Sequence, residues 1–151
     1  MPESTIQERL AWPVEPATYR RIKRLWVRHS IAEDRRDLQG LIETLAPDCL
    51  YEIVRTGQRW IGHEGARAFY TAFLAAFPDV HFDLTDIVIG PQGVIEVATM
   101  TGTHEGEWAG LLPSRHPVRL TILIHFPWDP AARLFAGERI YFDRAALAQD
   151  R

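Results

Sequence analysis

The sequence predicts a single α+β domain in which helices come first and strands follow. Apolar residues recur at helical spacing through the first half of the chain, and they alternate with polar residues through the second half. Short turns such as Gly90-Pro91-Gln92-Gly93 separate the alternating segments. Because the helices and strands are segregated along the chain, the pattern favours an α+β fold over a βαβ fold.

The N-terminal segment is expected to be an arm, and a helix follows it. Residues 1–16 contain three prolines and little periodicity, so we expect the arm to pack on the surface or on a second subunit. A helix over 17–33 is predicted from the spacing of its apolar positions, which are Ile22, Leu25, Trp26 and His29.

Two further helices and a first hairpin are expected before residue 78. A short helix begins at Leu38, with Asp37 as its N-cap, and ends before Pro47. A strand over 49–54, a turn at Thr56-Gly57 and a short return strand at 60–61 come next. A third helix over 64–77 carries aromatic residues on one broad face.

The remaining residues are predicted to form long antiparallel strands. Alternation begins at Val80, and return strands are expected over 94–103, 117–128 and 134–142. A helical turn over 145–149 is expected to follow the last strand.

Composition and charge exclude several function classes. With 151 residues, 46% apolar and 25% charged, the chain resembles an ordinary globular protein. Its net charge of −3 argues against a nucleic-acid surface, and the basic cluster at 20–24 is expected to be a solvated helix face. The single cysteine, Cys49, excludes an intrachain disulfide and is expected to be packed. With neither a signal peptide nor a 20-residue apolar run, we expect a cytoplasmic protein that does not bind membranes.

Four segments, in order along the chain, resemble motifs of the SnoaL-like polyketide cyclases of the nuclear transport factor two-like superfamily. Residues 62–70 resemble the family's helix entry G-x-E-(Gly/Ala)-(Ile/Ala)-R-x-F-Y, and residues 77–82 its strand start F-P-D. Residues 102–113 resemble its loop G-T-H-x-G-x-(aromatic)-x-G-(Leu/Ile)-P-P, and residues 138–147 its ending E-x-(Ile/Val)-x-(Phe/Tyr)-D-x-x-x-L.

The resemblance implies a cone-shaped domain, in which three helices pack on a strongly curved antiparallel sheet around a small-molecule pocket. The expected division of the chain is an arm at 1–16, the SnoaL-like domain at 17–147 and a tail at 148–151. The superfamily includes cyclases, isomerases, dehydratases, epoxide hydrolases and non-enzymatic binding proteins, so the fold does not fix the function. The run Glu138-Arg139-Ile140-Tyr141 departs from the E-H-W-D motif of the classical cyclases, which argues against cyclisation of an aromatic polyketide.

A resemblance in spacing to the lindane dehydrochlorinase and scytalone dehydratase branch points to Asp34 and His81 as catalytic residues. A carboxylate that orients an imidazole would make His81 a general base near neutral pH. The alternative is that Asp34 is a solvated helix end and that His81, on the polar phase of its strand, faces water.

Aromatic and histidine side chains are the candidates for the pocket wall, because a ligand site combines apolar walls with a few polar groups. The candidates are Tyr51, Trp60, Tyr70, His104, Trp108, His125 and Tyr141. His104 is expected either at the pocket rim or hydrogen-bonded within its own loop, and His29 is expected to be a hydrogen-bonded core residue. Along the last strand, Tyr141 shares one face with Arg139, and Glu138 lies on the other; the sequence leaves open which face is inward.

We expect no metal and no cofactor. The six histidines show no H-x-H or H-E-x-x-H spacing, and no glycine-rich phosphate loop opens a helix.

The leading hypothesis is a cofactor-independent enzyme that moves a proton on a small apolar or aromatic substrate, as a cyclase, isomerase, dehydratase or lyase. The alternatives are a binding module for a hydrophobic metabolite and a structural dimerisation domain. A homodimer is expected in each case, because an open sheet with an apolar outer face usually finds a partner.

Overall fold

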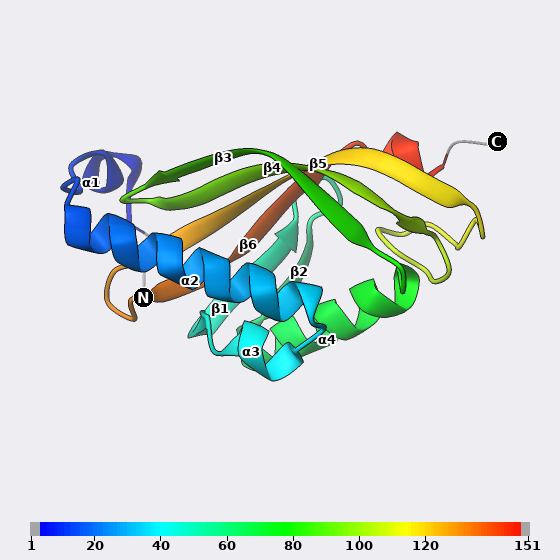
Figure 1. Cartoon of the computed structure of the whole chain (residues 1–151), viewed down its shortest axis with the longest axis horizontal. Helices are drawn as coiled ribbons and strands as arrows, with labels where there is room; N and C mark the ends of the chain where they lie inside the picture. Colours follow the sequence, from blue (N-terminus) through cyan, green and yellow to red (C-terminus); the bar gives the residue numbers. More distant parts are fainter. Residues whose placement is uncertain (1–3, 149–151) are drawn as a thin grey trace.

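The structure, a computed structural model, describes residues 4–148, in which helices lie beneath one strongly curved sheet (Figure 1). This arrangement confirms the predicted α+β class and the cone-like shape. Within the described residues, no helix is both long and apolar enough to cross a membrane.

Helices α2 (Pro16–Asp34) and α4 (Gly62–Ala76) cover the inner face of the sheet and α3 (Leu38–Ile42) packs against both of them, all close to their predicted positions. Helix α2 begins with a proline at its first position, where a missing N–H costs nothing. Helix α3 begins at Asp37, whose side chain accepts a hydrogen bond from the Gly40 N–H at 3.0 Å, which confirms the predicted N-cap. Helix α4 buries its aromatic face against the sheet.

The expected arm contains a short helix that the sequence analysis does not include. Helix α1 (Ile6–Leu10) is held by a capping box in which Thr5 and Glu8 bond each other's backbone N–H groups. It packs on the surface of the same chain, where the Gln92 side chain of the β3–β4 turn donates a hydrogen bond to the Arg9 carbonyl at 2.7 Å. Five residues are too few for apolar periodicity to reveal a helix.

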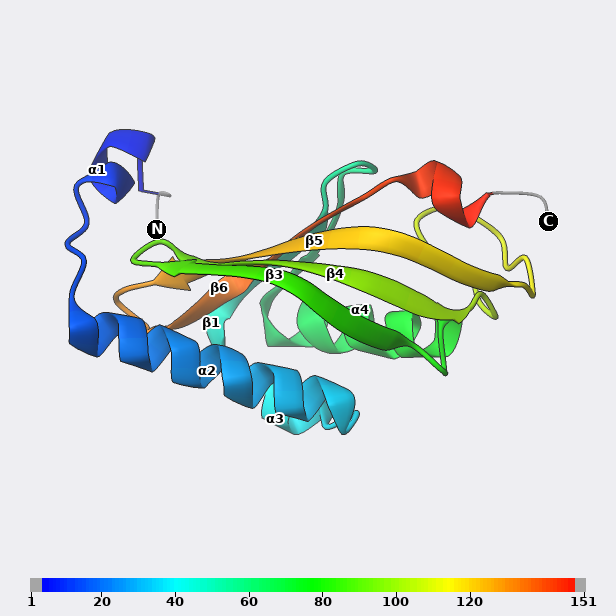
Figure 2. The same ribbon diagram turned by 45° about the horizontal axis from the view of Figure 1, so that its top comes forward.

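Six strands form one sheet in the order β2-β1-β6-β5-β4-β3. They are β1 (Leu45–Ile53), β2 (Gln58–Ile61), β3 (His81–Gly90), β4 (Gly93–Thr103), β5 (Pro117–Asp129) and β6 (Leu134–Phe142). Neighbouring strands are antiparallel except β1 and β6, which pair in parallel with Tyr51 opposite Glu138. Strand β6 thus lies inside the sheet, over the helices (Figure 2).

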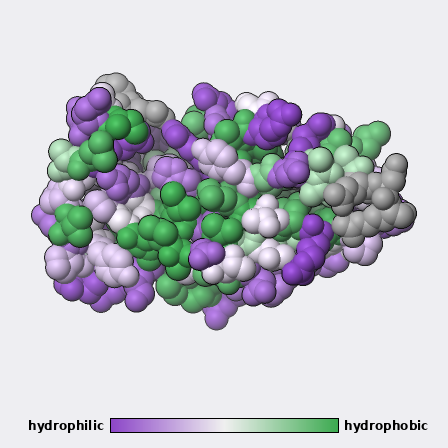
Figure 3. All heavy atoms as spheres, turned by 90° about the horizontal axis from the view of Figure 1, so that it is seen from above, coloured by the Kyte–Doolittle hydropathy of each residue, from purple (hydrophilic) through white to green (hydrophobic). Residues whose placement is uncertain are grey.

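The sheet has a buried inner face and a partly exposed outer face. Along β5 every second residue from Val118 to Trp128 is buried, and the residues between them are exposed or half-buried. This period of two is the expected signature of a strand covered on one side. Figure 3 looks onto the molecule from above, where hydrophobic side chains gather among polar ones.

The loop at 104–116 is fastened to the domain at its start and near its middle. Asp79 accepts hydrogen bonds from the backbone N–H and the hydroxyl of Thr103, both at 2.7 Å, and these bonds lower the pKa of the Asp79 carboxyl. Arg144, in the closing 3-10 turn η1 (Arg144–Leu147), donates to the Ala109 carbonyl at 2.7 Å. The closing turn ends within the described residues, whereas most of the predicted tail, residues 149–151, lies outside them.

Candidate functional site

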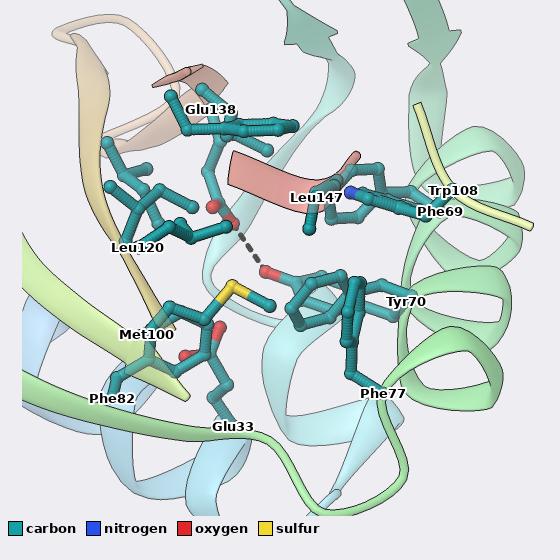
Figure 4. Close-up of a pocket in the computed structure, with 15 residues that line it drawn as sticks. Glu33, Phe69, Tyr70, Phe77, Phe82, Met100, Trp108, Leu120, Glu138 and Leu147 are labelled. Atoms are coloured by element: carbon teal, nitrogen blue, oxygen red, sulfur yellow. Dashed lines mark hydrogen bonds between the residues drawn. The ribbon is translucent and has the colours of Figure 1, made fainter. Parts of the chain in front are cut away.

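A narrow apolar cavity lies between the helices and the inner face of the sheet (Figure 4). Phe69, Phe73 and Trp108 form one wall, and Leu120, Ile122 and Ile140 form the other. The space between the lining side chains, mouth included, is about 440 Å³, but the centre of a water molecule can occupy only about 20 Å³ of it. That is room for one or two waters. A larger ligand therefore enters only when the lining side chains move apart.

Two carboxyl groups point into this apolar space from opposite elements (Figure 4). Glu138 is 2% exposed and lies on β6, where it shares the inner face with Ile140 and Phe142. Glu33 lies on α2, one helical turn after the buried His29. Residues four apart lie on the same face of a helix, so the face that buries His29 also directs Glu33 inward.

The hydroxyl of Tyr70 is the centre of a buried hydrogen-bond network. It donates to the carboxylate of Glu138, and it lies 2.8 Å from the hydroxyl of Tyr51 and 3.0 Å from Nε2 of His29. Nε2 of His29 is also 3.3 Å from Oε2 of Glu138, and both of these side chains are 2% exposed. The four residues come from α2, β1, α4 and β6, so one carboxylate connects the helical layer to the sheet.

A hydroxyl group fixes the orientation of the His29 ring. Nδ1 of His29 lies 2.7 Å from the hydroxyl of Thr44, which donates its own hydrogen to the Leu41 carbonyl at 2.7 Å. Because this hydroxyl has only one hydrogen, it accepts from Nδ1, and Nδ1 therefore carries a proton. The prediction that His29 is a hydrogen-bonded core residue is confirmed.

Burial and repulsion by the negative charge of Glu138 raise the pKa values of the acidic groups in and around the cavity. Burial raises the pKa of Glu33 well above its usual value, and the nearby charge of Glu138 adds to the effect. Burial also raises the pKa of Glu96 to about 7, although a hydrogen bond at 3.0 Å from the indole N–H of Trp26 opposes the shift. The pKa values of Tyr51 and Tyr70 are raised by burial and by the charge of Glu138.

Asp34 and His81, the predicted catalytic pair, both lie on the exposed surface. Within residues 4–148, no hydrogen bond or ion pair joins them, and neither lines the cavity. The premise that they meet inside the cavity is wrong, because Asp34 is one residue past Glu33 and so points about 100° away around the helix. His81 stands at the exposed start of β3.

Four of the predicted pocket aromatics lie at or beside the cavity. Tyr70 and Trp108 line it, and Tyr51 is buried behind Tyr70. Trp60 stacks on Trp108 with ring centroids 6.2 Å apart and also packs against Phe69. These rings pack edge to face or offset, as aromatic clusters prefer.

His104 is buried in the rim loop and does not line the cavity. Its ring stacks on Phe77, with centroids 5.1 Å apart, and its backbone bonds His116 and Arg115 across the loop. Burial lowers its pKa, and the nearby backbone of Gly106 opposes that shift. Of the two expectations for His104, its backbone bonds match the second, a residue bonded within its own loop.

His125 and Tyr141 lie on the outer face of the sheet, so their predicted place in the pocket is wrong. Both alternate with inward-facing neighbours, His125 with Ile124 and Tyr141 with Ile140. Burial lowers the pKa of His125, as do the positive charges of Arg139 and Arg9. Tyr141 is 41% exposed.

Sequence reasoning missed the two carboxyl groups of the cavity, Glu33 and Glu138, and also the buried carboxyl of Glu96, which does not line it. A signal for Glu138 was available, because it occupies a position that alternation assigns to the same face as Ile140. Within the part of the chain that the structure describes, no three His, Cys, Asp or Glu side chains are placed to hold a metal ion. Cys49 is buried as expected, and burial raises its pKa to about 11.

A family model supplies the classification. The model for SnoaL-like polyketide cyclases matches residues 17–151 of this sequence, and the chain therefore belongs to the SnoaL-like polyketide cyclase family. Comparison with curated proteins finds no match to the sequence.

Solved structures share the fold at low sequence identity. A proposed SnoaL-like polyketide cyclase from Jannaschia sp. CCS1 is 21% identical, with 93% of this chain and 97% of that chain covered and a TM-score of 0.71. The proposed hydroxylase AclR from Streptomyces galilaeus is 21% identical, with 85% and 93% covered and a TM-score of 0.67. IdmH from Streptomyces antibioticus, a proposed polyketide cyclase, is 21% identical, with 84% and 95% covered and a TM-score of 0.66.

Proposed function

We propose that the protein is an enzyme that moves a proton on a small, apolar carbonyl compound, with Glu138 as the general base and Glu33 as the general acid. One observation carries the proposal: two carboxyl groups point into one apolar cavity, and their surroundings differ. Glu138 is held by the hydroxyl of Tyr70 and by His29, whereas burial and the charge of Glu138 raise the pKa of Glu33 and so favour its protonated form. Two titratable groups whose surroundings separate their pKa values can act as base and acid at one pH.

The first chemical step follows from these roles. The carboxylate of Glu138 takes a proton from a carbon next to a carbonyl group, and the electron pair of the broken C–H bond moves to the carbonyl oxygen. The protonated carboxyl of Glu33 donates a hydrogen bond to that oxygen and stabilises its charge, which counts for more in a dry cavity than in water. The resulting enolate can be reprotonated, attack a second carbonyl or expel a leaving group.

That single step is common to isomerase, cyclase, lyase and dehydratase reactions. The proposal assigns it to side chains of the chain itself, and proton transfer of this kind needs no cofactor. The lining residues add support, because aromatic and aliphatic walls with two polar groups suit an uncharged aromatic substrate.

The test uses 2-tetralone, an uncharged aromatic ketone with exchangeable protons beside its carbonyl. In D2O, proton NMR follows the loss of these protons with wild type, Glu138→Gln and Tyr141→Phe, a control on the same strand but on the outer face. We expect the wild type and the control to accelerate exchange equally, and Glu138→Gln to be at least about 100-fold slower.

Two results would contradict the proposal, the first for the role of Glu138 and the second for the enzymatic function. If Glu138→Gln exchanged the ketone at the wild-type rate, Glu138 would not be the base. If 2-tetralone shifted the NMR signals of Trp108 without any accelerated exchange, the protein would be a binding module for hydrophobic compounds.

A further inference from the structure

We propose that His29 is held as a buried imidazolium, and that this stored positive charge keeps Glu138 ionised as the base. The inference rests on the proposed function for its catalytic meaning, but the charge state of His29 can be measured without any substrate. His29 does not line the cavity; it acts through Glu138 and Tyr70 and is therefore a positioning residue.

A count of hydrogen atoms in the network supports the positive charge. The hydroxyl of Thr44 donates to Leu41, so Nδ1 of His29 carries one proton. The hydroxyl of Tyr70 uses its only hydrogen on Glu138, so the oxygen of Tyr70 can only accept from its other neighbours. Nε2 of His29 then faces two acceptors, the Tyr70 oxygen at 3.0 Å and Oε2 of Glu138 at 3.3 Å. It satisfies them only as a donor, and a ring with a proton on both nitrogens is an imidazolium.

The charges around the network agree with this assignment. The titratable groups that face Glu138 are His29 and Glu33 on α2, Cys49 and Tyr51 on β1, Tyr70 on α4 and Glu96 on β4. Burial and the charge of Glu138 raise the pKa values of Glu33, Cys49, Tyr51, Tyr70 and Glu96. The raised pKa values favour the neutral form of each of these groups, and Glu96, with a pKa of about 7, is half-ionised at that pH. The network then contains one negative charge on Glu138 and one positive charge on His29, and a buried charge needs such a partner.

Apolar rings enclose the histidine and leave the carboxylate as its charged neighbour. The ring of His29 meets Phe126 edge to face at 5.2 Å and Phe135 at 6.3 Å. In such low-dielectric surroundings, an ion pair is strong and breaking it by removing one partner is costly. The positive charge of His29 thereby stabilises the ionised carboxylate of Glu138, which is the form that can take a proton from the substrate.

The experiment measures the charge state of His29 directly. Protein labelled with nitrogen-15 in histidine is studied by long-range proton–nitrogen NMR at pH 7.5, where the two ring nitrogens report separately whether each is protonated. The variants are Glu138→Gln, which removes the counter-charge, and Glu96→Gln, a matched control with a neighbouring buried carboxyl. His29→Gln identifies the signal by its disappearance.

We expect both nitrogens of His29 to be protonated in the wild type and in Glu96→Gln, and only Nδ1 to be protonated in Glu138→Gln. A wild-type His29 with one protonated nitrogen would overturn the inference, and this result needs no variant to fold. Retention of both protons in folded Glu138→Gln would also overturn it, because the charge would then not depend on Glu138.

A second measurement tests the positioning role. In the 2-tetralone assay, the pH midpoint of exchange by His29→Gln is expected to move up by at least one unit relative to wild type, whereas a purely structural loss would lower the rate at every pH equally. An unmoved midpoint would overturn the positioning role. If His29 is doubly protonated but the wild type does not accelerate exchange of the ketone protons, the ion pair between His29 and Glu138 is supported and the proposed enzymatic function is contradicted.

Discussion

The two faces of strands β4, β5 and β6 are built from the same alternating sequence, yet they hold different chemistry. The inner face carries Glu96, Phe126 and Glu138, all buried beneath the helices. The outer face carries Ile95, which is 40% exposed, and Leu123, which is half-buried. Because the strands supply side chains to both faces alike, the covering helices create the site. A carboxyl group on the outer face would be solvated, and its pKa would stay close to the usual value for its residue type.

The largest contrast is expected in stability. Replacing Phe126 with alanine leaves a cavity next to His29 and Phe135, and should lower the free energy of unfolding by about 3–5 kcal/mol. Replacing Leu123, which lies on the outer face three residues earlier on the same strand, with alanine should cost about 1 kcal/mol, because a partly exposed side chain loses little contact. Urea denaturation of both variants measures the difference. An equal loss would mean that Leu123 contributes as much to the stability of the fold as Phe126 does.

A smaller effect is expected from pH, through Glu96 on the inner face. Its pKa in the folded protein, about 7, exceeds its usual value of 4.5, so the folded state binds more protons than the unfolded state between those pH values. Stability from this group is therefore fully present below pH 4.5 and is lost as the pH rises through 7, by at most about 3 kcal/mol. Glu96→Gln, whose amide oxygen can still accept from Trp26, should gain stability over wild type at pH 8 but not at pH 4.5.

Thermal denaturation at the two pH values checks this sign. Asp83→Asn, at an exposed position of β3, is the control and should follow the wild type at both. A Glu96→Gln variant that is less stable than wild type at pH 8 would contradict the prediction.

The smallest effect concerns assembly on the outer face. Val97, Leu123 and Tyr141 are neighbours across three strands and form an apolar row, which we expect to pair with a second copy of the chain. Leu123→Lys should weaken that dimer by about 30-fold, roughly 2 kcal/mol, because a charge would have to be buried. Leu112→Lys, an 80% exposed position on the rim loop, is the matched control. Light scattering at micromolar concentration measures the mass; a monomeric wild type would refute the pairing.

The fold was largely predictable because its signals are local. Alternation gave the bounds of β6 at Leu134 and Phe142, and helical spacing located α2 and α4 within a few residues. The parallel pairing of β1 with β6 was not predictable, since nothing in either segment indicates which strand lies beside it.

The site was harder to predict, because it depends on contacts between distant segments. Choosing Asp34 instead of Glu33 is an error of one residue in sequence and about 100° around the helix. His29 was correctly placed in the core, but its importance comes from Glu138, which is far away along the chain and adjacent to it in space. A resemblance in spacing favoured His81, and its phase along the strand favoured His125. Only the covering elements show that both face outward.

The position of β6 also governs how the chain reaches this structure. The parallel edge of β1 pairs with β6, and β6 is the last strand along the chain. Strand β6 therefore joins the β2-β1 pair, on which α4 packs, to the strands β5-β4-β3, two of which contact α2. We therefore expect the core to form through contacts between the two halves of the sequence, which are entropically costly to close. Tyr51 and Glu138 are paired in the register of these two strands, so the step that pairs β1 with β6 also assembles the buried hydrogen-bond network.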